Sequence, residues 1–471
     1  MVTIVCMNTV LIALTFSFTT LLSFVPSAHA ANATASEKGT GMNDRYKNLE
    51  LFQKVLQFVE KNYVDPVKNE ELMNGAIKGM LETLDPHSNF LTPEVFRDVK
   101  IDTSGKFAGV GIEVVVKDDI LTVLAPMEDS PAWKAGIQPG DKIVKINGDS
   151  TKGFTLSEAV LKMRGKDGSP VVFTIYRKGW SKFKNITVKR EMVKVKTVKS
   201  DELEPGYGYI RLAQFNETAA KEVAAALTKL EKINAKDGLK GIVFDLRTNP
   251  GGLLDQAVDV SSLFIDDGVI VSTVGRDPSQ KDIRYAKKGQ ARKDLPVVVL
   301  VNSSTASAAE IVAAALQEHH RAMILGDTTF GKGSVQTIID LGNDLGLKLT
   351  IARYYTPNGN SIQEKGVVPD IFLEEYDPKL LAKAKIKHDA TRERDLRGHL
   401  INNQTAAANK DEFSVQEFAD QEKGKAAGKK AEEEDLTDMA PVQFNSRDDV
   451  QVAQALKYLK SFDVFKKIKK E

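Results

Sequence analysis

The chain has 471 residues, of which 27% are charged and 42% hydrophobic, and its formal net charge is +1. This length suits about three domains, and the composition is that of a globular protein with solvated segments. The near-neutral charge gives no sign of a surface for nucleic acid or anionic membrane, so we expect no nucleic-acid partner. The single cysteine, Cys6, excludes an internal disulfide and a cysteine-based zinc site.

The first thirty residues have the pattern of a secretory signal peptide, although no Lys or Arg precedes the apolar run. That run covers about 9–24 and ends at Pro26, and the Ala-His-Ala at 28–30 has the form of a cleavage site. We therefore predict a signal peptide over 1–30, a linker over 31–42, and an exported, periplasmic protein. The alternative is an uncleaved membrane anchor, which would keep the protein at the membrane.

Two blocks follow the linker. Apolar residues at helical spacing predict helices over 46–63 and about 69–83, within a helical region that we bound at 43–100. The next block, 105–191, alternates short apolar runs with Gly and Asp turns, which predicts a β-rich domain.

The block from 192 to 380 alternates strand and helix patterns. Its near-continuous apolar runs predict buried strands, of which 241–247 and 295–301 are the clearest. Buried strands that alternate with helices argue for an α/β layer architecture. From 390 to 445 the chain is polar and poor in aromatics, which predicts disorder, and helical periodicity returns over 447–466. Helical segments at both ends favour self-association.

The stretch GDTTFGKGSVQ (326–336) comes within one residue of a phosphate-binding P-loop. Gly333 stands where the magnesium-binding Ser or Thr belongs, and the residues after Lys332 predict a strand where a P-loop needs a helix. Lys332 between glycines can instead be buried, which lowers the pKa of its amine and makes it a general base.

Such a base needs a nucleophile, and NSSTASAAEI (302–311) offers three candidate serines after a predicted strand: Ser303, Ser304 and Ser307. A helix N-terminus at this place supplies N–H groups that stabilise an oxyanion. The alternative for Ser307 is a capping box with Glu310.

The histidines are poor partners for these serines. His319 and His320 follow Ser307 on one predicted helix at about 18 Å, which is too far for a base, and His87 lies in a loop that reads as structural. His388 and His399 fall at or inside the charged tail. For a hydrolase, a Ser–Lys dyad is therefore a better hypothesis than a Ser–His–Asp triad. The turn TNPGG (248–252) supplies backbone N–H groups either for an oxyanion hole or for a tight turn only.

Together these motifs resemble the C-terminal processing (tail-specific) serine peptidases, which carry a PDZ domain. The resemblance covers about 45–375 and rests on LDPHSNFLTPE, FAGVGIEV, FDLRTNPGGLL, NSSTASAAEI and GKGSVQ, in that order. It implies a multidomain α/β protein with a helical N-terminal segment, a PDZ domain, a crotonase/Clp-like Ser/Lys protease core and a partly disordered C-terminal region ending in a helix. The tail beyond about 380 departs from the simplest members.

By motif, the resemblance implies Ser307 as nucleophile, Lys332 as base and Gln336 as the residue that orients the lysine. The interval of 25 residues from 307 to 332 is the usual one in the family. It also implies an oxyanion hole from the N–H groups of Ala308 and the TNPGG glycines, Gly251 and Gly252.

The β-rich block then corresponds to the PDZ domain. Its carboxylate-binding loop is implied at Gly109, Val110, Gly111 and Ile112, where N–H groups capture a peptide C-terminus. The alternative is a glycine-containing strand entry. Arg164 is a candidate for coupling this domain to the core, or an ordinary solvated arginine.

These expectations describe a serine endopeptidase that captures apolar or unstructured protein C-termini and processes or degrades exported proteins. No cofactor or metal is implied, and an adaptor or activator protein is a conceivable partner. The alternative function is a catalytically silent PDZ adaptor that binds C-terminal peptides.

Overall fold

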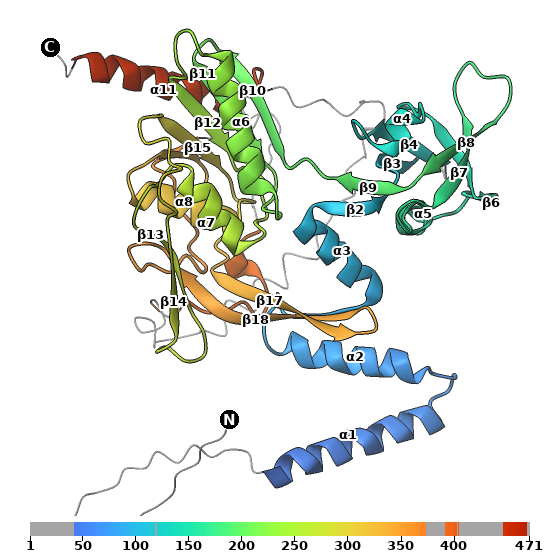
Figure 1. Cartoon of the computed structure of the whole chain (residues 1–471). Helices are drawn as coiled ribbons and strands as arrows, with labels where there is room; N and C mark the ends of the chain where they lie inside the picture. Colours follow the sequence, from blue (N-terminus) through green and yellow to red (C-terminus); the bar gives the residue numbers. More distant parts are fainter. Residues whose placement is uncertain (1–41, 118–119, 374–390, 403, 405–445, 469–471) are drawn as a thin grey trace, which may run out of the picture. The chain divides into compact units, whose positions relative to one another are not determined.

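The computed structural model describes residues 42–117, 120–373, 391–402, 404 and 446–468 (Figure 1). The chain divides into two units, one ending at Leu72 and one beginning at Met73. Within the described ranges no helix is both long enough and apolar enough to cross a membrane. The predicted signal peptide and linker lie outside these ranges.

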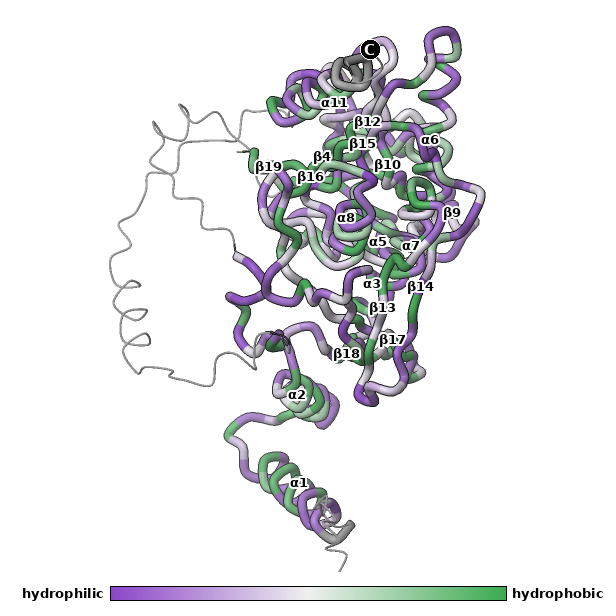
Figure 2. The backbone as a smooth tube through the Cα atoms, turned by 90° about the vertical axis from the view of Figure 1, so that its left-hand side faces the viewer, coloured by the Kyte–Doolittle hydropathy of each residue, from purple (hydrophilic) through white to green (hydrophobic). Residues whose placement is uncertain are grey.

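The first unit contains the predicted helix α1 (Met42–Asn62) and the start of α2 (Asn69–Glu82). Apolar and polar residues alternate along α1, as Figure 2 shows by colour. Several large apolar side chains of α1 are exposed, among them Leu49, Phe52, Val55 and Phe58. The second unit starts inside α2 and contains everything that follows.

After α2 the chain forms β1 (Asn89–Leu91) and α3 (Pro93–Ser104). Pro93 occupies the first turn of α3, where a missing N–H costs nothing. Gly105 ends the helix with φ 66°, a left-handed cap, and its N–H donates to Ile101 at 2.7 Å.

The predicted PDZ block forms two antiparallel sheets. The larger one has the order β3-β4-β5-β7-β8, with β6 paired to β5, and the smaller one pairs β2 with β9. Its described part contains, in chain order, β2 (Lys106–Gly109), β3 (Ile112–Lys117), β4 (Ile120–Pro126), α4 (Pro131–Lys134), β5 (Lys142–Ile146), β6 (Asp149–Ser150), α5 (Leu156–Met163), β7 (Pro170–Tyr176), β8 (Lys184–Lys189) and β9 (Glu191–Lys194). Strand β3 is therefore an edge strand of the described sheet.

The core contains a six-stranded sheet of order β10-β11-β12-β15-β16-β19. Its strands from β11 to β19 are parallel, and β10 joins them antiparallel. The elements are β10 (Val198–Glu204), β11 (Tyr207–Leu212), α6 (Ala219–Ile233), β12 (Gly241–Asp245), α7 (Leu254–Ser262), β15 (Val297–Val301), α8 (Ala308–Glu318), β16 (Met323–Gly326), β19 (Ile371–Phe372) and α11 (Val450–Ile468). The predicted α/β layer architecture is confirmed.

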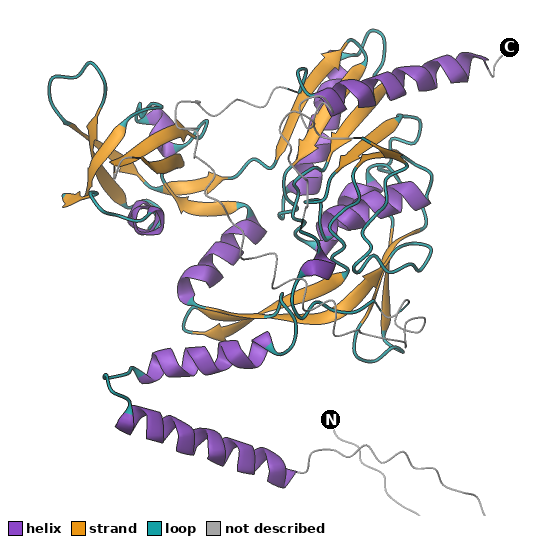
Figure 3. Cartoon of the chain, turned by 180° about the vertical axis from the view of Figure 1, so that it is seen from behind, coloured by secondary structure: helices purple, strands orange, loops and turns teal. Residues whose placement is uncertain are grey.

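The side chains of successive residues in each strand point to opposite faces of this sheet. Ile242 and Phe244 of β12 pack with helices α6, α7 and α8 on one face. Val243 of the same strand packs on the other face with Val452 and Leu459 of α11. Figure 3 shows α11 lying across the strands on that face. The C-terminal helix is thus part of the core.

A second core sheet has the order β1-β18-β13-β14, with β17 paired to β18. It is built from β13 (Val269–Val274), β14 (Lys281–Tyr285), β17 (Ser334–Gly342), β18 (Leu345–Tyr355) and β1. The residues after Lys332 form β17, as predicted, so the helix that a P-loop requires is absent from this described segment.

The prediction of disorder over 390–445 is wrong for its first part. Residues 391–402 are described and include a 3-10 turn, η1 (Glu393–Asp395). Side-chain contacts hold this segment on the core: Arg392 pairs with Asp327 at 3.2 Å, and His399 with Glu364 at 2.7 Å. Composition alone could not reveal these long-range partners. Residues 405–445 lie outside the described ranges.

Candidate active site

Two loops meet at the carboxyl ends of β12 and β15, the edge of a parallel sheet where α/β proteins bind ligands. The first is the turn 248–252, in which Asn249 is fully buried. Its amide donates to Leu212 and accepts the N–H of Gly251, both at 2.8 Å. A Cβ on Gly252 would lie 2.2 Å from the carbonyl oxygen of Phe215, so this close approach requires glycine.

The second loop carries Ser307 immediately before α8. Ser307 has φ 56° and ψ −117°, a conformation that is strained for a residue with a side chain. The two loops touch, because a Cβ on Gly251 would lie 2.7 Å from Cβ of Ser307 and 2.9 Å from the nitrogen of Ala308. Ser303 and Ser304 belong to the preceding turn and do not cap the helix.

The N–H groups near Ser307 differ in availability. No acceptor is found in the described ranges for the N–H of Gly252 or of Ala308. The N–H of Gly251 is taken by Asn249. Of the three expected oxyanion donors, Gly252 and Ala308 therefore have free N–H groups, and Gly251 supplies the close backbone contact to Ser307.

Glu310, in the first turn of α8, joins the serine loop to the lysine loop. Its fully buried carboxylate accepts the N–H of Ser307 at 2.8 Å and, on the other side, the N–H of Gly331 at 2.7 Å and of Lys332 at 3.0 Å. The hydroxyl of Thr329 also donates to it. Burial raises the pKa of Glu310 to about 7, against the opposing effect of these hydrogen bonds.

Lys332 is partly buried between two glycines that no other residue fits. A Cβ on Gly333 would lie 2.8 Å from the nitrogen of Gln363, and Gly331 has φ 96°. Burial lowers the pKa of Lys332 to about 8, helped by the like charge of Lys348. No hydrogen bond joins its amine to Ser307 Oγ in the part of the chain described here, as is common before substrate binds.

Tyr354, from β18, bridges the same two residues on their carbonyl side. Its buried hydroxyl donates to the carbonyl oxygen of Ser307 at 3.1 Å and also lies against the carbonyl oxygen of Lys332. Glu310 thus binds the N–H groups of Ser307 and Lys332, and Tyr354 contacts their carbonyl groups. The capping-box interpretation of Ser307 and Glu310 anticipated the bond from the Ser307 N–H. Sequence reasoning missed the bonds of Glu310 to the lysine loop and the role of Tyr354, because neither residue carries a local signal of such distant contacts.

The expected orienting residue, Gln336, lies on β17. Its amide nitrogen donates to the hydroxyls of Ser334 at 3.0 Å and of Thr350 at 3.2 Å. Thr350 in turn donates to Asp85 at 3.1 Å, so the loop LDPHSNF reaches this sheet. No hydrogen bond between Gln336 and Lys332 is formed in the described residues.

A buried ion pair lies between the end of β12 and the turn 248–252. Asp245 and Arg247 pair at 2.7 Å, and Arg247 also pairs with Asp449 at 3.0 Å, just before α11. Gln451 accepts a further bond from Arg247 at 2.6 Å. The residues around the start of α11 therefore stabilise the residues that precede the turn 248–252.

In the PDZ block, the loop at 109–112 presents free donors. The carbonyls of Val110 and Gly111 accept bonds from Ala132 and Met127, both at 2.9 Å. Within the described residues their own N–H groups have no acceptor. Gly109 ends β2 and Ile112 begins the edge strand β3, so the loop leads directly into an unpaired edge.

Arg164 ends α5 and pairs with Asp98 of α3, while its guanidinium lies 5.9 Å from the ring centre of Phe107. It therefore connects the PDZ block to α3, which packs on β18.

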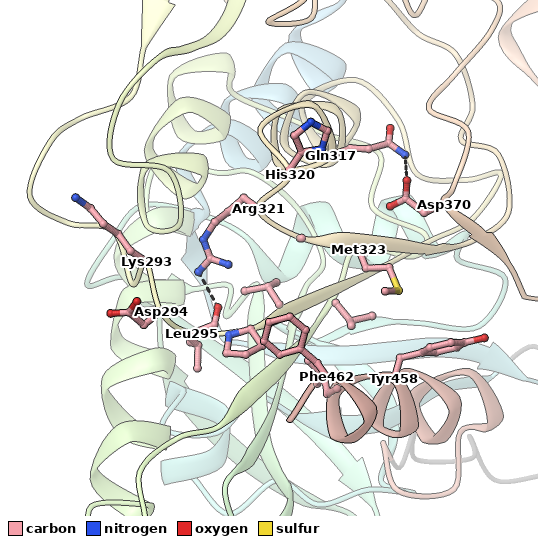
Figure 4. A pocket seen from close by; sticks show the side chains of 15 residues that line it. Lys293, Asp294, Leu295, Gln317, His320, Arg321, Met323, Asp370, Tyr458 and Phe462 are labelled. Atoms are coloured by element: carbon pink, nitrogen blue, oxygen red, sulfur yellow. Dashed lines mark hydrogen bonds between the residues drawn. The ribbon is translucent and has the colours of Figure 1, made fainter. Parts of the chain in front are cut away.

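A cavity of about 630 Å³ lies elsewhere, between α11 and the starts of β15 and β16 (Figure 4). Tyr458 and Phe462 line it on the helix side and Arg321 on the other. It opens at the amino ends of these strands, opposite the edge that carries Ser307, so it is separate from the candidate site.

Sequence comparisons place these observations in a family. The model of peptidase family S41 matches residues 206–373, that of a PDZ domain 122–177, and that of the CtpB activating protease N-terminal domain 10–95. A carboxy-terminal-processing protease of Bartonella bacilliformis is 46% identical over 75% of this chain and 81% of its own length.

Two further matches are a curated protein and a solved structure. The carboxy-terminal processing protease CtpA of Bacillus subtilis is 40% identical over 68% of each chain. The solved structure of a photosystem II D1 C-terminal processing protease is 31% identical, with a TM-score of 0.40 over 74% of this chain and 94% of that one. On the identity and coverage of the Bartonella and Bacillus proteins, the chain belongs to peptidase family S41 and is a serine-type peptidase of the carboxy-terminal processing kind.

Proposed function

We propose that this peptidase cuts exported proteins near their C-termini, with Ser307 as nucleophile and Lys332 as general base. One observation carries the assignment: the buried carboxylate of Glu310 accepts the N–H of both residues, at 2.8 and 3.0 Å. The backbone of a strained serine at a helix N-terminus is thereby linked to that of a lysine whose pKa burial lowers to about 8. Such a lysine is partly neutral at physiological pH and can accept a proton.

Substrate capture is assigned to the PDZ domain. The free N–H groups of Val110 and Gly111 would bind the terminal carboxylate, and the edge strand β3 would pair with the substrate backbone. Unstructured tails fit this mode, because an edge strand pairs only with an extended segment.

In acylation, Ser307 Oγ attacks the scissile carbonyl carbon while its proton passes to Lys332 Nζ. The negative charge that develops on the carbonyl oxygen is stabilised by the N–H groups of Gly252 and Ala308. The C–N bond then breaks, and the leaving amine takes the proton from Lys332. An acyl-enzyme on Ser307 and a free C-terminal fragment result.

In deacylation, water attacks the acyl carbon and gives a proton to Lys332. The C–O bond to Ser307 breaks, Oγ recovers the proton, and the shortened substrate leaves. Gln336 is assigned to orienting Lys332 during this cycle, through a rearrangement of the amide now bonded to Ser334 and Thr350.

The test is cleavage of an unstructured protein with an apolar C-terminal tail by the full chain. Ser307→Ala and Lys332→Ala should each lower kcat/KM by about a thousandfold or more, with circular dichroism unchanged. Ser303→Ala and Ser304→Ala are the matched controls and should cut like the wild type. Wild-type activity in Ser307→Ala would overturn the assignment.

Capture is tested separately with paired peptide substrates that differ only in a free or an amidated C-terminus. Amidation should raise KM about tenfold and leave kcat unchanged, because it removes a charge that the PDZ loop binds. Equal KM values for the two peptides would show that the carboxylate is not recognised.

Export is assigned to residues 1–30 on their sequence pattern. Expression of the full gene product in a Gram-negative host, followed by fractionation and N-terminal sequencing, should recover a periplasmic chain that starts at Ala31. An intact N-terminus in the membrane fraction would favour the uncleaved anchor.

A further inference from the structure

The segment 391–402 lies outside the residues that match the peptidase family model, yet it reaches the lysine of the proposed dyad. The N–H of Glu393 donates to the carbonyl of Phe330 at 3.1 Å, two residues before Lys332. The N–H of Asn402 donates to Glu364 at 2.9 Å. The segment is therefore bonded to the loop that presents the lysine.

The carboxylate of Glu393 is fully buried and held from two sides. Nε2 of His87 lies 2.9 and 2.8 Å from its two oxygens. The amide of Gln363 donates to it at 3.0 Å, and the same amide accepts the N–H of Gly333 at 2.8 Å. Glu393 is thus connected to the residues on both sides of Lys332.

A buried carboxylate is costly unless a charge or hydrogen bonds compensate it. Gln363 supplies one bond, and His87 supplies a second when Nε2 carries a proton. Burial raises the pKa of Glu393, whereas the contacts with His87 and Gln363 and, after them, the charge of Lys332 lower it. Glu393 in turn raises the pKa of Lys332, against the larger lowering by burial.

We propose that Glu393 is a positioning residue for Lys332, held in place by His87 and Gln363. Its carboxylate stabilises the ammonium that forms when Lys332 takes the proton of the serine, and it keeps the amine directed within the loop. This inference rests on the proposed role of Lys332 as the base. The site is then assembled from three separate stretches of the chain: the loop of His87, the core, and the segment 391–402.

Other charges also face Lys332. Lys348 opposes its protonation, whereas Glu310 and Asp85 favour it together with Glu393. Glu310 is already bonded to four donors of the two loops, and Asp85 is bonded to Ser88 and Thr350. Glu393 differs from both, because it comes from a segment that none of the three matching family models covers.

The chain offers a matched control, a core residue that contacts the same segment. Glu364 pairs with His399 at 2.7 Å, so it anchors the segment through the same residue types as Glu393 and His87. Glu364 is not among the charges that act on the pKa of Lys332. Glu364→Gln therefore weakens the anchoring, while Glu393→Gln also removes the charge beside the lysine.

The experiment measures kcat and KM against pH for the full chain, its Glu393→Gln and Glu364→Gln variants, and Lys332→Ala. Loss of a negative charge destabilises the ammonium, so Glu393→Gln should move the acid limb of kcat to lower pH by about one unit. It should also lower kcat about tenfold at unchanged KM. Glu364→Gln should leave the pH of the acid limb of kcat unchanged.

An unshifted acid limb in Glu393→Gln, with Lys332→Ala inactive, would overturn this inference and leave the Ser–Lys assignment standing. Activity in Lys332→Ala would instead overturn the proposed function itself. If Glu393→Gln does not fold, His87→Gln is the second variant, since it leaves the carboxylate and removes the ring that holds it. A fall in kcat at constant KM supports the proposal, and wild-type kcat contradicts it.

Discussion

The serine side and the lysine side of the site are built in different ways. The serine side comes from two strand–loop–helix units of one sheet, with Ser307 in the loop between β15 and α8 and Gly252 in the loop between β12 and α7. The lysine side is assembled from distant segments, with Glu310, Tyr354 and Glu393 all converging on the loop of Lys332. A nucleophile can be placed by local chain geometry, whereas a base with a lowered pKa needs an enclosure.

The largest effect is expected where the two sides join. Glu310→Ala leaves buried donors of Ser307, Thr329 and Lys332 without an acceptor, so we expect a loss of about 3–5 kcal/mol in unfolding free energy. Cleavage should fall by at least about a hundredfold. Urea denaturation and a peptide cleavage assay measure the two effects.

The control for this change is Glu318→Ala at the other end of α8. Glu318 also accepts several bonds, from Thr356 at 2.7 Å and Asn358 at 2.7 Å among others, but none from the dyad loops. It should cost stability and spare kcat. Equal losses of activity in the two variants would contradict a joining role for Glu310.

The serine side is tested by Gly252→Ala. The added Cβ meets the carbonyl oxygen of Phe215, and φ is 141°, so the turn must move, and with it the N–H that we propose for the oxyanion hole. We expect kcat to fall by about a hundredfold with a smaller change in KM. Gly359→Ala, at φ 80° with nothing within 4 Å, adds only backbone strain and should leave kcat unchanged.

Tyr354→Phe should have an intermediate effect. Removal of the hydroxyl leaves the carbonyl oxygens of Ser307 and Lys332 without this hydrogen-bond donor. We therefore expect a loss of about 1–2 kcal/mol in unfolding free energy and of about tenfold in kcat. Tyr355→Phe, at the next residue of β18, is the control for loss of a tyrosine hydroxyl as such. Unchanged cleavage in Tyr354→Phe would mean that Glu310 suffices to hold the loops together.

The smallest effect is expected at the PDZ connection. Arg164 and Asp98 are both partly exposed, so their pair should contribute about 1 kcal/mol or less. A double-mutant cycle of Arg164→Ala and Asp98→Ala measures this coupling. A loss of kcat/KM well beyond the loss of stability would show that the pair transmits substrate binding to the core.

The same contrast explains what the sequence can predict. Apolar runs and glycine turns are local, so the strands around Ser307, the helix α8 and the strand after Lys332 follow from the pattern. Glu393 and His87 lie far apart in the chain and meet only in the fold, and a charged tail around Glu393 has the composition of a disordered segment. The bond between Gly251 and Asn249 is equally invisible, since a glycine pair shows only that a tight turn is needed.

The most direct test of the Ser–Lys account is labelling by a serine-reactive phosphonate at a series of pH values, with the modified residue identified by mass spectrometry. Because burial lowers the pKa of Lys332 to about 8, the labelling rate of Ser307 should rise with pH through that value and be lost in Lys332→Ala. Labelling at Ser303 or Ser304, or a rate at Ser307 that is unaffected by Lys332→Ala, would contradict the account.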